Sequence, residues 1–310
     1  MILMCKDNEV FDFDSEKVIN EKLLPGYMKR LPCKEAYNKW IAMRYNTGSN
    51  SLARRLRGLT FGQGNREKIN IETRMLSLSD CYWIKEKDEN ITFAEVSPYH
   101  SYYWTGEKEY EGGAIPTLYV NGALNKEWLS NGNLYKQGDL EIELGCINLC
   151  KKCGIDVEDG MLCEDGVELI NFTSEDVMLE QADMSGKIHP ENFTTDDIIE
   201  VFGLEGVQML TIDAIVGNGD RHAGNFGFLR DANTGEYVKM APLYDFDHAL
   251  DSVQYEKADF LIRELLEIKE PCYIDEIKRI CDIAKDYPHE IFSKRAELIL
   301  KNINKKGGFI

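Results

Sequence analysis

IVGNGDRHAGNFGFLRDANTGEYVKMAPLYDFDHAL, from Ile215 to Leu250, joins the end of an apolar helical run to a glycine-rich loop and then to a predicted β-hairpin. The helical run, Val207 to Val216, ends at the first glycine of the loop. Glycines at this density predict a tight turn rather than a continued helix. The loop carries these polar residues: Asp220, Arg221, His222 and Asn225.

The hairpin predicted after this loop leads to a further acidic position. One strand covers Phe226 to Leu229, and the turn lies at Asn233 to Gly235. The second strand then runs toward Asp245. Polar groups are therefore gathered at the two ends of the hairpin.

These polar groups match the few that phosphoryl transfer needs. The reaction requires a carboxylate that orients or deprotonates the acceptor hydroxyl, and oxygen ligands that hold magnesium on the phosphates. Asp220 and Asn225, separated by four residues, have the spacing of a kinase catalytic Asp and its metal-binding Asn. Asp245 stands where the second magnesium-binding carboxylate is expected. Oxygen ligands without a dense cysteine or histidine shell favour magnesium over zinc.

The motif Asp-Arg-His-x-x-Asn, followed by Tyr-Asp-Phe-Asp-His, resembles the catalytic and metal-binding loops of the HipA-like serine/threonine kinases. It resembles those of phosphatidylinositol kinases more distantly. The resemblance implies that Asp220 is the catalytic residue and that Asn225 and Asp245 bind Mg²⁺. His222 supports the loop, either chemically or as a polar residue in a tight turn.

The resemblance extends upstream, over roughly residues 112 to 250, and implies an ATP site. Asn121 to Lys126 resembles the phosphate-covering loop, with Asn125 where a proline is common, and Lys136 resembles the nucleotide-binding lysine. Glu143 resembles the glutamate that pairs with this lysine, with Glu141 as a rival. The residues implied in cofactor binding are Gly122, Ala123, Asn125, Lys126 and Lys136, together with Glu180, Gln181 and Ala182 as the hinge that binds adenine through its backbone.

The predicted fold class is α+β, a two-lobed protein-kinase-like fold with a β-rich N-lobe, a helical C-lobe and an N-terminal accessory segment. Residues 1–110 form the accessory segment, 111–183 the N-lobe and 184–310 the C-lobe, with ATP in the cleft. Taken alone, Asp-x-x-x-x-Asn would also fit a surface hairpin with acidic loops. The order of the glycine turn, Lys136, the Glu143 helix and the two loops favours the kinase fold.

Local signals predict the main elements. Helices are expected at 34–44 and 140–153, the second closed by Gly154. The Asn131-Gly132 pair predicts a hairpin turn, and residues 167–172 and 177–181 are predicted to form a strand pair. Thr194 and Asp197 predict a capping box, and residues 257–304 are helical, with Pro271 and Pro288 as breakers.

Composition narrows the class of protein. The chain has 310 residues, 43% of them hydrophobic, and a formal net charge of -18, which disfavours direct nucleic-acid binding. The N-terminus lacks a signal-peptide pattern and no stretch reaches the length of a membrane span, so we expect a cytoplasmic protein whose nine cysteines stay reduced. Cys146, Cys150 and Cys153 could suggest an iron–sulfur cluster, but their spacing is that of a buried helical stripe.

The predicted function is an ATP- and Mg²⁺-dependent kinase that transfers phosphate to an alcohol group. The most favoured acceptor is a serine or threonine of a protein, and the resemblance implies a toxin or effector with an antitoxin-like partner. A lipid or small-molecule kinase of the same fold, and a nucleotide-binding pseudokinase or interaction module, are the alternatives. The sequence does not decide between these acceptors.

Overall fold

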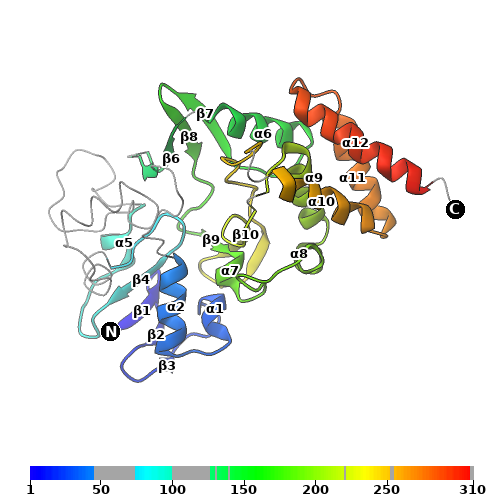
Figure 1. Cartoon of the computed structure of the whole chain (residues 1–310). Helices are drawn as coiled ribbons and strands as arrows, with labels where there is room; N and C mark the ends of the chain where they lie inside the picture. Colours follow the sequence, from blue (N-terminus) through cyan, green and yellow to red (C-terminus); the bar gives the residue numbers. More distant parts are fainter. Residues whose placement is uncertain are drawn as a thin grey trace. The chain divides into compact units, whose positions relative to one another are not determined.

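The computed structural model describes residues 1–44, 74–99, 126–129, 131–138, 140–219, 221–251 and 255–307 (Figure 1). The chain divides into two compact units. The β-rich unit comprises Met1–Gly138, Asp159–Lys187 and Gly227–Lys239, and the helical unit comprises Asp139–Glu158, Ile188–Phe226 and Met240–Ile310. Each unit is built from segments that are distant in sequence. The division into residues 1–110, 111–183 and 184–310 stays a prediction.

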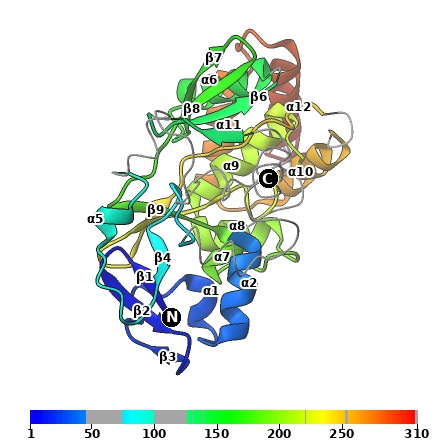
Figure 2. The same ribbon diagram turned by 90° about the vertical axis from the view of Figure 1, so that its left-hand side faces the viewer.

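An antiparallel sheet begins the β-rich unit, with the strand order β3-β2-β1-β4. Figure 2 shows β1, β2 and β4 beside the helices α1 and α2. The predicted helix at 34–44 is confirmed by α2. The bounds are β1 (Ile2–Cys5), β2 (Asn8–Asp12), β3 (Lys17–Val18), α1 (Gly26–Lys29), α2 (Lys34–Arg44), β4 (Tyr82–Lys85) and α5 (Phe93–Val96).

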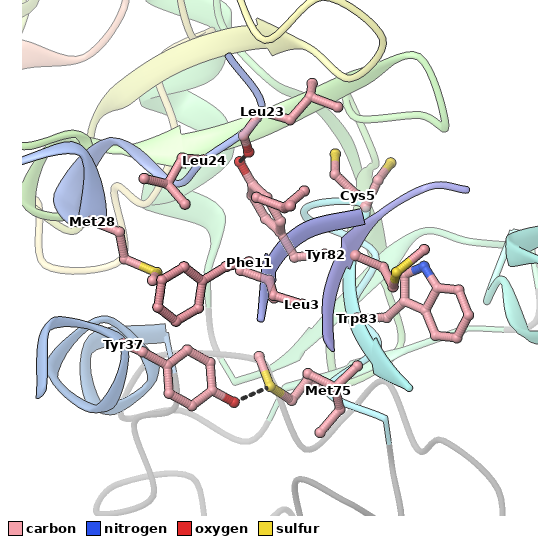
Figure 3. Close-up of a cluster of buried hydrophobic side chains, with 14 of the residues drawn as sticks. Leu3, Cys5, Phe11, Leu23, Leu24, Met28, Tyr37, Met75, Tyr82 and Trp83 are labelled. Carbon is pink, nitrogen blue, oxygen red and sulfur yellow. Dashed lines mark hydrogen bonds between the residues drawn. The ribbon is translucent and has the colours of Figure 1, made fainter. Parts of the chain in front are cut away.

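A hydrophobic core lies between this sheet and its helices. All four residues of β1 are buried, so the apolar start of the chain is a central strand of this core. Figure 3 shows Phe11 and Tyr37 packed in it, with the Tyr37 hydroxyl 2.9 Å from the Met75 sulfur. Tyr82 and Trp83 are buried here as well.

The second sheet of the β-rich unit is also antiparallel, in the order β5-β6-β8-β7. The predicted turn at Asn131 and Gly132 is confirmed: Gly132 has φ +85°, and its N–H donates to the Leu129 carbonyl at 2.9 Å. Residues 121–125 of the predicted phosphate-covering loop lie outside the described residues. The bounds are β5 (Lys126–Trp128), β6 (Leu134–Gln137), β7 (Asp159–Cys163) and β8 (Gly166–Ile170).

The third sheet has the order β11-β10-β9, with β9 (Val177–Gln181), β10 (Gly227–Asp231) and β11 (Tyr237–Met240), and α7 (Ala182–Ser185) follows β9. The predicted pairing of 167–172 with 177–181 is wrong, although both strands exist. β8 pairs with β6 and β7, and β9 pairs with β10. A Cβ at Gly227 would lie 2.4 Å from the Glu180 carbonyl oxygen, so only glycine allows this close pairing.

The helical unit is organised around α9, whose residues are buried on nearly every side. Helices α8, α10, α11 and α12 all pack against it. Figure 1 shows α10, α11 and α12 following one another toward the C-terminus. The bounds are α6 (Glu141–Lys152), α8 (Thr195–Phe202), α9 (Leu204–Val216), α10 (Tyr255–Glu267), α11 (Pro271–Ala284) and α12 (Glu290–Gly307).

Helix ends in this unit follow the local signals in the sequence. Thr194 and Asp197 form the predicted capping box of α8. Gly154 has φ +68° and donates to the Lys151 carbonyl, while Ile155 donates to the Cys150 carbonyl, which is the Schellman arrangement at the end of α6. Pro271 opens α11 as its first residue. None of the helices in the described part of the chain is long and apolar enough to cross a membrane.

Candidate active site

The residues predicted to form the site divide between the two units. Lys126, Lys136 and the segment 180–182 belong to the β-rich unit, and Glu143, His222, Asn225 and Asp245 belong to the helical unit. The predicted pairing of Lys136 with Glu143 stays a prediction. Four of the predicted residues lie outside the described residues: Asp220, Gly122, Ala123 and Asn125.

In the helical unit, the loop after α9 is fixed by a buried ion pair between Arg221 and Asp213. Nε of Arg221 donates to Oδ2 of Asp213 at 2.9 Å, and Nη2 donates to Oδ1 at 2.8 Å. The two side chains are 4% and 0% exposed. Burial opposes the charge of Arg221, but the Asp213 carboxylate outweighs it and raises the arginine pKa. The guanidinium is therefore a permanently charged, fixed group.

Arg221 also connects the two segments that carry the predicted metal ligands. Its Nη1 donates to the carbonyl oxygens of Asn225 at 2.8 Å and Tyr244 at 2.6 Å. The guanidinium carbon lies 4.8 Å from the centre of the Phe246 ring. A single side chain thus contacts Asn225 itself and both neighbours of Asp245. The structure brings the two predicted ligands onto one support.

The segment around Asp245 has a special backbone conformation. Asp245 has φ +63°, in the left-handed region where only Gly, Asn and Asp are common. Its N–H donates to Oε1 of Glu158 at 3.1 Å, and the next N–H, of Phe246, donates to Oε1 of Glu143 at 3.3 Å. Glu143 is fully buried on α6. Both glutamates hold the main chain at Asp245 in place.

His222 has a role within its own loop. It is exposed, and its Nδ1 accepts a hydrogen bond from the Gly224 N–H at 3.1 Å. Its carbonyl accepts from the Asn225 N–H at 2.8 Å. These contacts favour the interpretation of His222 as a support of the turn. Asn225 itself is buried, which is unusual for an amide side chain away from a specific site.

In the β-rich unit, Lys126 lies directly opposite Lys136 in the pairing of β5 with β6. Directly opposite residues point to the same face of a sheet, with Cβ atoms about 5 Å apart. Both lysines are buried, at 3% and 2% exposed. Val167 on β8 and Leu169, opposite Leu134, continue the same face with apolar side chains. Two lysine side chains therefore start from neighbouring positions on an otherwise apolar face.

The predicted hinge lies at the end of β9, which is an edge of its sheet. Leu179 donates to the Ser79 carbonyl at 2.7 Å, on the side of β9 away from β10. Because main-chain groups alternate along a strand, the N–H and C=O of Gln181 point to that same side. The Glu180 side chain points into the unit, where Gly26 N–H donates to it at 2.7 Å. The Glu180 carboxylate is thus occupied within the unit.

Asp183, directly after this segment, was not predicted from the sequence. Burial raises its pKa to about 6, and its Oδ1 is buried without a hydrogen-bond partner among the described residues. A mostly buried carboxyl with one oxygen that has no partner among the described residues, next to a predicted ligand site, is a typical mark of function. Local sequence offers no signal for it, because the polar stretch after Gln181 favours a plain connector.

Comparisons with known proteins give the fold. No family model matches the chain. The structure of HipA of Shewanella oneidensis MR-1, in its complex with HipB and operator DNA, is similar to this chain. The match covers 99% of this chain and 97% of the HipA chain, with a TM-score of 0.59 and 13% sequence identity. The chain has the fold of HipA. At the level of the fold, the resemblance predicted from the two loop motifs is thereby confirmed.

A sequence relative supports the HipA-like assignment over part of the chain. The serine/threonine-protein kinase CtkA of Helicobacter pylori is 31% identical over 105 residues, which are 31% of this chain and 30% of CtkA. The match therefore spans less than a third of that relative. The match with the crystal structure of CtkA, a proinflammatory kinase, covers 60% of this chain and 92% of the CtkA chain, with 21% sequence identity and a TM-score of 0.38.

Proposed function

We propose that this HipA-like chain is an ATP- and Mg²⁺-dependent phosphotransferase that acts on serine or threonine side chains of a protein. The observation that carries the proposal is the pair of buried lysines, Lys126 and Lys136, on one face of the β5–β6 hairpin. A sheet face that carries two lysines attracts a polyanion. The phosphates of a nucleotide are such a polyanion.

The β-rich unit supplies what a nucleotide needs. The lysine pair suits the phosphates, and the apolar face continued by Val167 suits the base and sugar. The outward main-chain groups of Gln181 would bind adenine. Asp183, with its buried carboxyl, would accept hydrogen bonds from the ribose hydroxyls.

The helical unit supplies oxygen donors that fit Mg²⁺. Asn225 and Asp245 would hold the ion, which when bound neutralises charge on the transferred phosphate. The described residues contain no cluster of three or more His, Cys, Asp and Glu side chains suited to a metal. Two protein ligands suffice here, because Mg²⁺ in kinases takes its remaining ligands from phosphate and water.

Each residue of the proposed site has a separate task. Asp220 would orient the acceptor hydroxyl and receive its proton. Arg221 holds Asn225 and the residue before Asp245 and does not touch the reacting atoms. Since positioning supplies most of the catalysis of phosphoryl transfer, this support is as necessary as the ligands it carries.

We propose a protein as the phosphate acceptor because the name of one relative states its acceptor. CtkA is named a serine/threonine-protein kinase, which favours a protein hydroxyl over a lipid. HipA is seen with a partner protein, HipB, and for this chain we propose a partner of the antitoxin kind. The net charge of -18 makes direct contact of this chain with DNA unfavourable.

The test is phosphate transfer from γ-labelled ATP with Mg²⁺, using purified protein and a cell extract as acceptor. We expect Asp220→Ala and Asp245→Ala to lower transfer by at least about a hundredfold, since each removes a group used in the reaction. Lys136→Met should abolish the thermal stabilisation by ATP, which for the wild type is about 2.7 kcal/mol at a hundred times Kd. Asp275→Ala and Lys257→Met, at exposed positions of α11 and α10, are the matched controls.

The same experiment separates the alternatives. Phosphoamino-acid analysis should find phosphoserine or phosphothreonine. Label found only in lipid or in a metabolite would contradict the protein acceptor but keep the kinase. Stabilisation by ATP with no transfer to any acceptor would favour a pseudokinase, and equal transfer by the wild type and both aspartate variants would contradict the site.

A further inference from the structure

The carboxylate of Glu180, one residue before the outward-facing Gln181, is bound to the N-terminal part of the chain. Gly26, the first residue of α1, donates its N–H to Oε1 of Glu180 at 2.7 Å. The Arg230 guanidinium lies 3.4 Å from both oxygens of the same carboxylate. Glu180 is 5% exposed and Arg230 is 0% exposed. The hinge strand is therefore anchored by a buried, charged contact.

Arg230 carries this contact onward to the first sheet. Its Nη1 donates to the Tyr82 hydroxyl at 2.7 Å, and Tyr82 is a buried residue of β4. Its Nη2 donates to the Lys22 carbonyl at 2.6 Å and to the Leu24 carbonyl at 3.0 Å, just before α1. The Tyr82 hydroxyl donates in turn to the Leu23 carbonyl at 2.8 Å. One guanidinium thus joins β9, β4 and the segment that leads into α1.

The segment after the hinge is held by the same part of the chain. A Cβ on Gly26 would lie 2.3 Å from the Ser185 carbonyl oxygen and 2.6 Å from the Tyr237 hydroxyl, so α1 and α7 touch backbone to backbone. Gly186, with φ +67°, approaches the Gly26 carbonyl in the same way, and Arg30 donates to the Gly186 carbonyl. Contacts on both sides of residues 181–184 therefore converge on Gly26.

We propose that Gly26, Arg230 and Glu180 are positioning residues, through which the N-terminal sheet fixes the hinge in the conformation that reads adenine. This inference rests on the proposed function, since it assigns base recognition to the backbone of residues 180–182. The role of residues 1–44 and 74–99 would then be to position the hinge, whereas the sequence indicated only an accessory segment. None of the three residues needs to touch the nucleotide.

If the hinge is positioned in this way, the anchor should affect nucleotides with different bases differently. Hydrogen bonds from a hinge backbone to adenine depend on its position within a few tenths of an ångström, and guanine presents a carbonyl where adenine presents an amino group. Contacts to the phosphates come from other residues and do not depend on the hinge. Shifting the anchor should therefore weaken ATP binding more than GTP binding.

The test compares dissociation constants for Mg²⁺-ATP and Mg²⁺-GTP in the full chain. Gly26→Ala forces α1 away from Ser185 without changing any charge, and Tyr82→Phe removes one hydroxyl from the Arg230 network. For each we expect the Kd for ATP to rise roughly five- to tenfold, as for one or two lost hydrogen bonds, and the Kd for GTP to change less than about twofold. Gly145→Ala, on α6 with nothing within 4 Å of the added Cβ, is the matched control.

A merely structural role would give a different result. Partial unfolding lowers the amount of competent protein and leaves the ATP-to-GTP preference of the remainder unchanged, so an unchanged ratio in both variants overturns the inference. Arg230→Lys keeps the charge but cannot make the branched contacts, and it should lose the preference as well, unlike Arg295→Lys, at the Asp259 pair of the helical unit. A wild type that binds neither nucleotide would overturn the proposed function itself.

Discussion

Arg221 and Asp213 form a two-point ion pair, with 2.9 Å from Nε to Oδ2 and 2.8 Å from Nη2 to Oδ1. The pair occupies both carboxylate oxygens and leaves Nη1 of the arginine to bind the main chain at Asn225 and Tyr244. Asn218 adds a third contact, from its side-chain amide to Oδ1 of Asp213 at 3.0 Å. The end of α9 is therefore the fixed point from which both predicted metal-binding segments are held.

Replacing Asp213 by asparagine should damage both stability and activity. The change removes the charge partner of a buried guanidinium, and loss of one member of such a pair costs about 3–5 kcal/mol. Urea unfolding, followed by tryptophan fluorescence, measures the free energy of unfolding. Transfer from γ-labelled ATP measures activity, which should fall even below the unfolding transition because Asn225 and Asp245 lose their common support.

The control for this prediction is Asp259→Asn, which removes the partner of another buried arginine. Arg295 lies 2.7 Å from Asp259, but this aspartate is half exposed and Arg295 also donates to the Ala214 carbonyl. Water can replace the lost carboxylate there, so a cost below about 1 kcal/mol is expected. Equal costs at Asp213 and Asp259 would mean that burial does not set the strength of the Arg221 pair.

Asp245→Gly should separate activity from stability. The aspartate sits at φ +63°, where glycine has no Cβ strain, while glycine gains more freedom in the unfolded chain. These effects oppose each other, so the free energy of unfolding should change by less than about 1 kcal/mol. Phosphate transfer should nevertheless be lost with the carboxylate. Leu250→Gly, at φ +62° and without a proposed ligand role, should retain transfer.

The elements that the sequence predicts correctly have their signals close together in the chain. The capping box at Thr194, the glycine after α6 and the Asn131-Gly132 turn each depend on contacts within a few residues. Strand pairing depends on distant partners. Residues 167–172 and 177–181 read as a hairpin because they are neighbours, yet each strand pairs elsewhere. The sheet formed by β1 to β4 was missed for the same reason, since β4 lies far along the chain from β1.

The candidate site divides in the same way. Asp220, Asn225 and Asp245 belong to short motifs that can be recognised in the sequence without knowledge of the fold. The residues that hold Asn225 and Asp245 act through distant contacts: Asp213, by way of Arg221, from within a helix, and Glu158 from the end of a connecting segment. Arg230, on a strand that looks like part of an ordinary hairpin, contacts Glu180 in the same long-range way. An arginine or aspartate of this kind is chemically indistinguishable in the sequence from one on the surface.

Asp183→Asn should change how stability depends on pH. Burial raises the pKa of Asp183 to about 6, above its ordinary value of 3.8, so the folded state holds the proton more tightly than the unfolded state. The protonated Asp183 carboxyl therefore contributes to the free energy of unfolding below its unfolded pKa, and this contribution is lost as the pH rises from about 4 to about 6. Asparagine stays neutral, so the variant should gain stability over the wild type with rising pH, by at most about 3 kcal/mol at pH 7.

The measurement for Asp183 is the difference in unfolding free energy between variant and wild type at pH 4.5 and at pH 7. Taking the difference cancels the other carboxyl groups, which titrate in both proteins. Asp176→Asn serves as the opposite case, because hydrogen bonds from Asn233 and Lys6 lower the pKa of Asp176. A constant difference across this range for Asp183→Asn would show that its carboxyl is charged and solvated at neutral pH.

The two cysteines of α6 and Cys153, which directly follows it, should be unreactive in the folded protein. Cys146, Cys150 and Cys153 are buried, and burial raises the pKa of all three, that of Cys153 to about 11. The thiolate is the reactive form, so neither alkylation nor metal binding is favoured at these positions at neutral pH. Cys163 and Cys272 are exposed and should react with a maleimide within minutes at pH 7. Mass spectrometry after digestion identifies the labelled thiols.

Unfolding in guanidinium chloride provides the comparison for this last prediction. All nine cysteines should then be labelled, which shows that burial rather than prior oxidation protected those of α6. Cys163→Ala with Cys272→Ala should leave a folded protein with little rapid labelling. Fast labelling of Cys146 or Cys150 in the native state would require α6 to open, and would loosen the hold of Glu143 on the Phe246 main chain. If the purified protein contained iron, and this iron were lost when Cys150 is replaced by alanine, the result would instead support an iron–sulfur cluster at this helix.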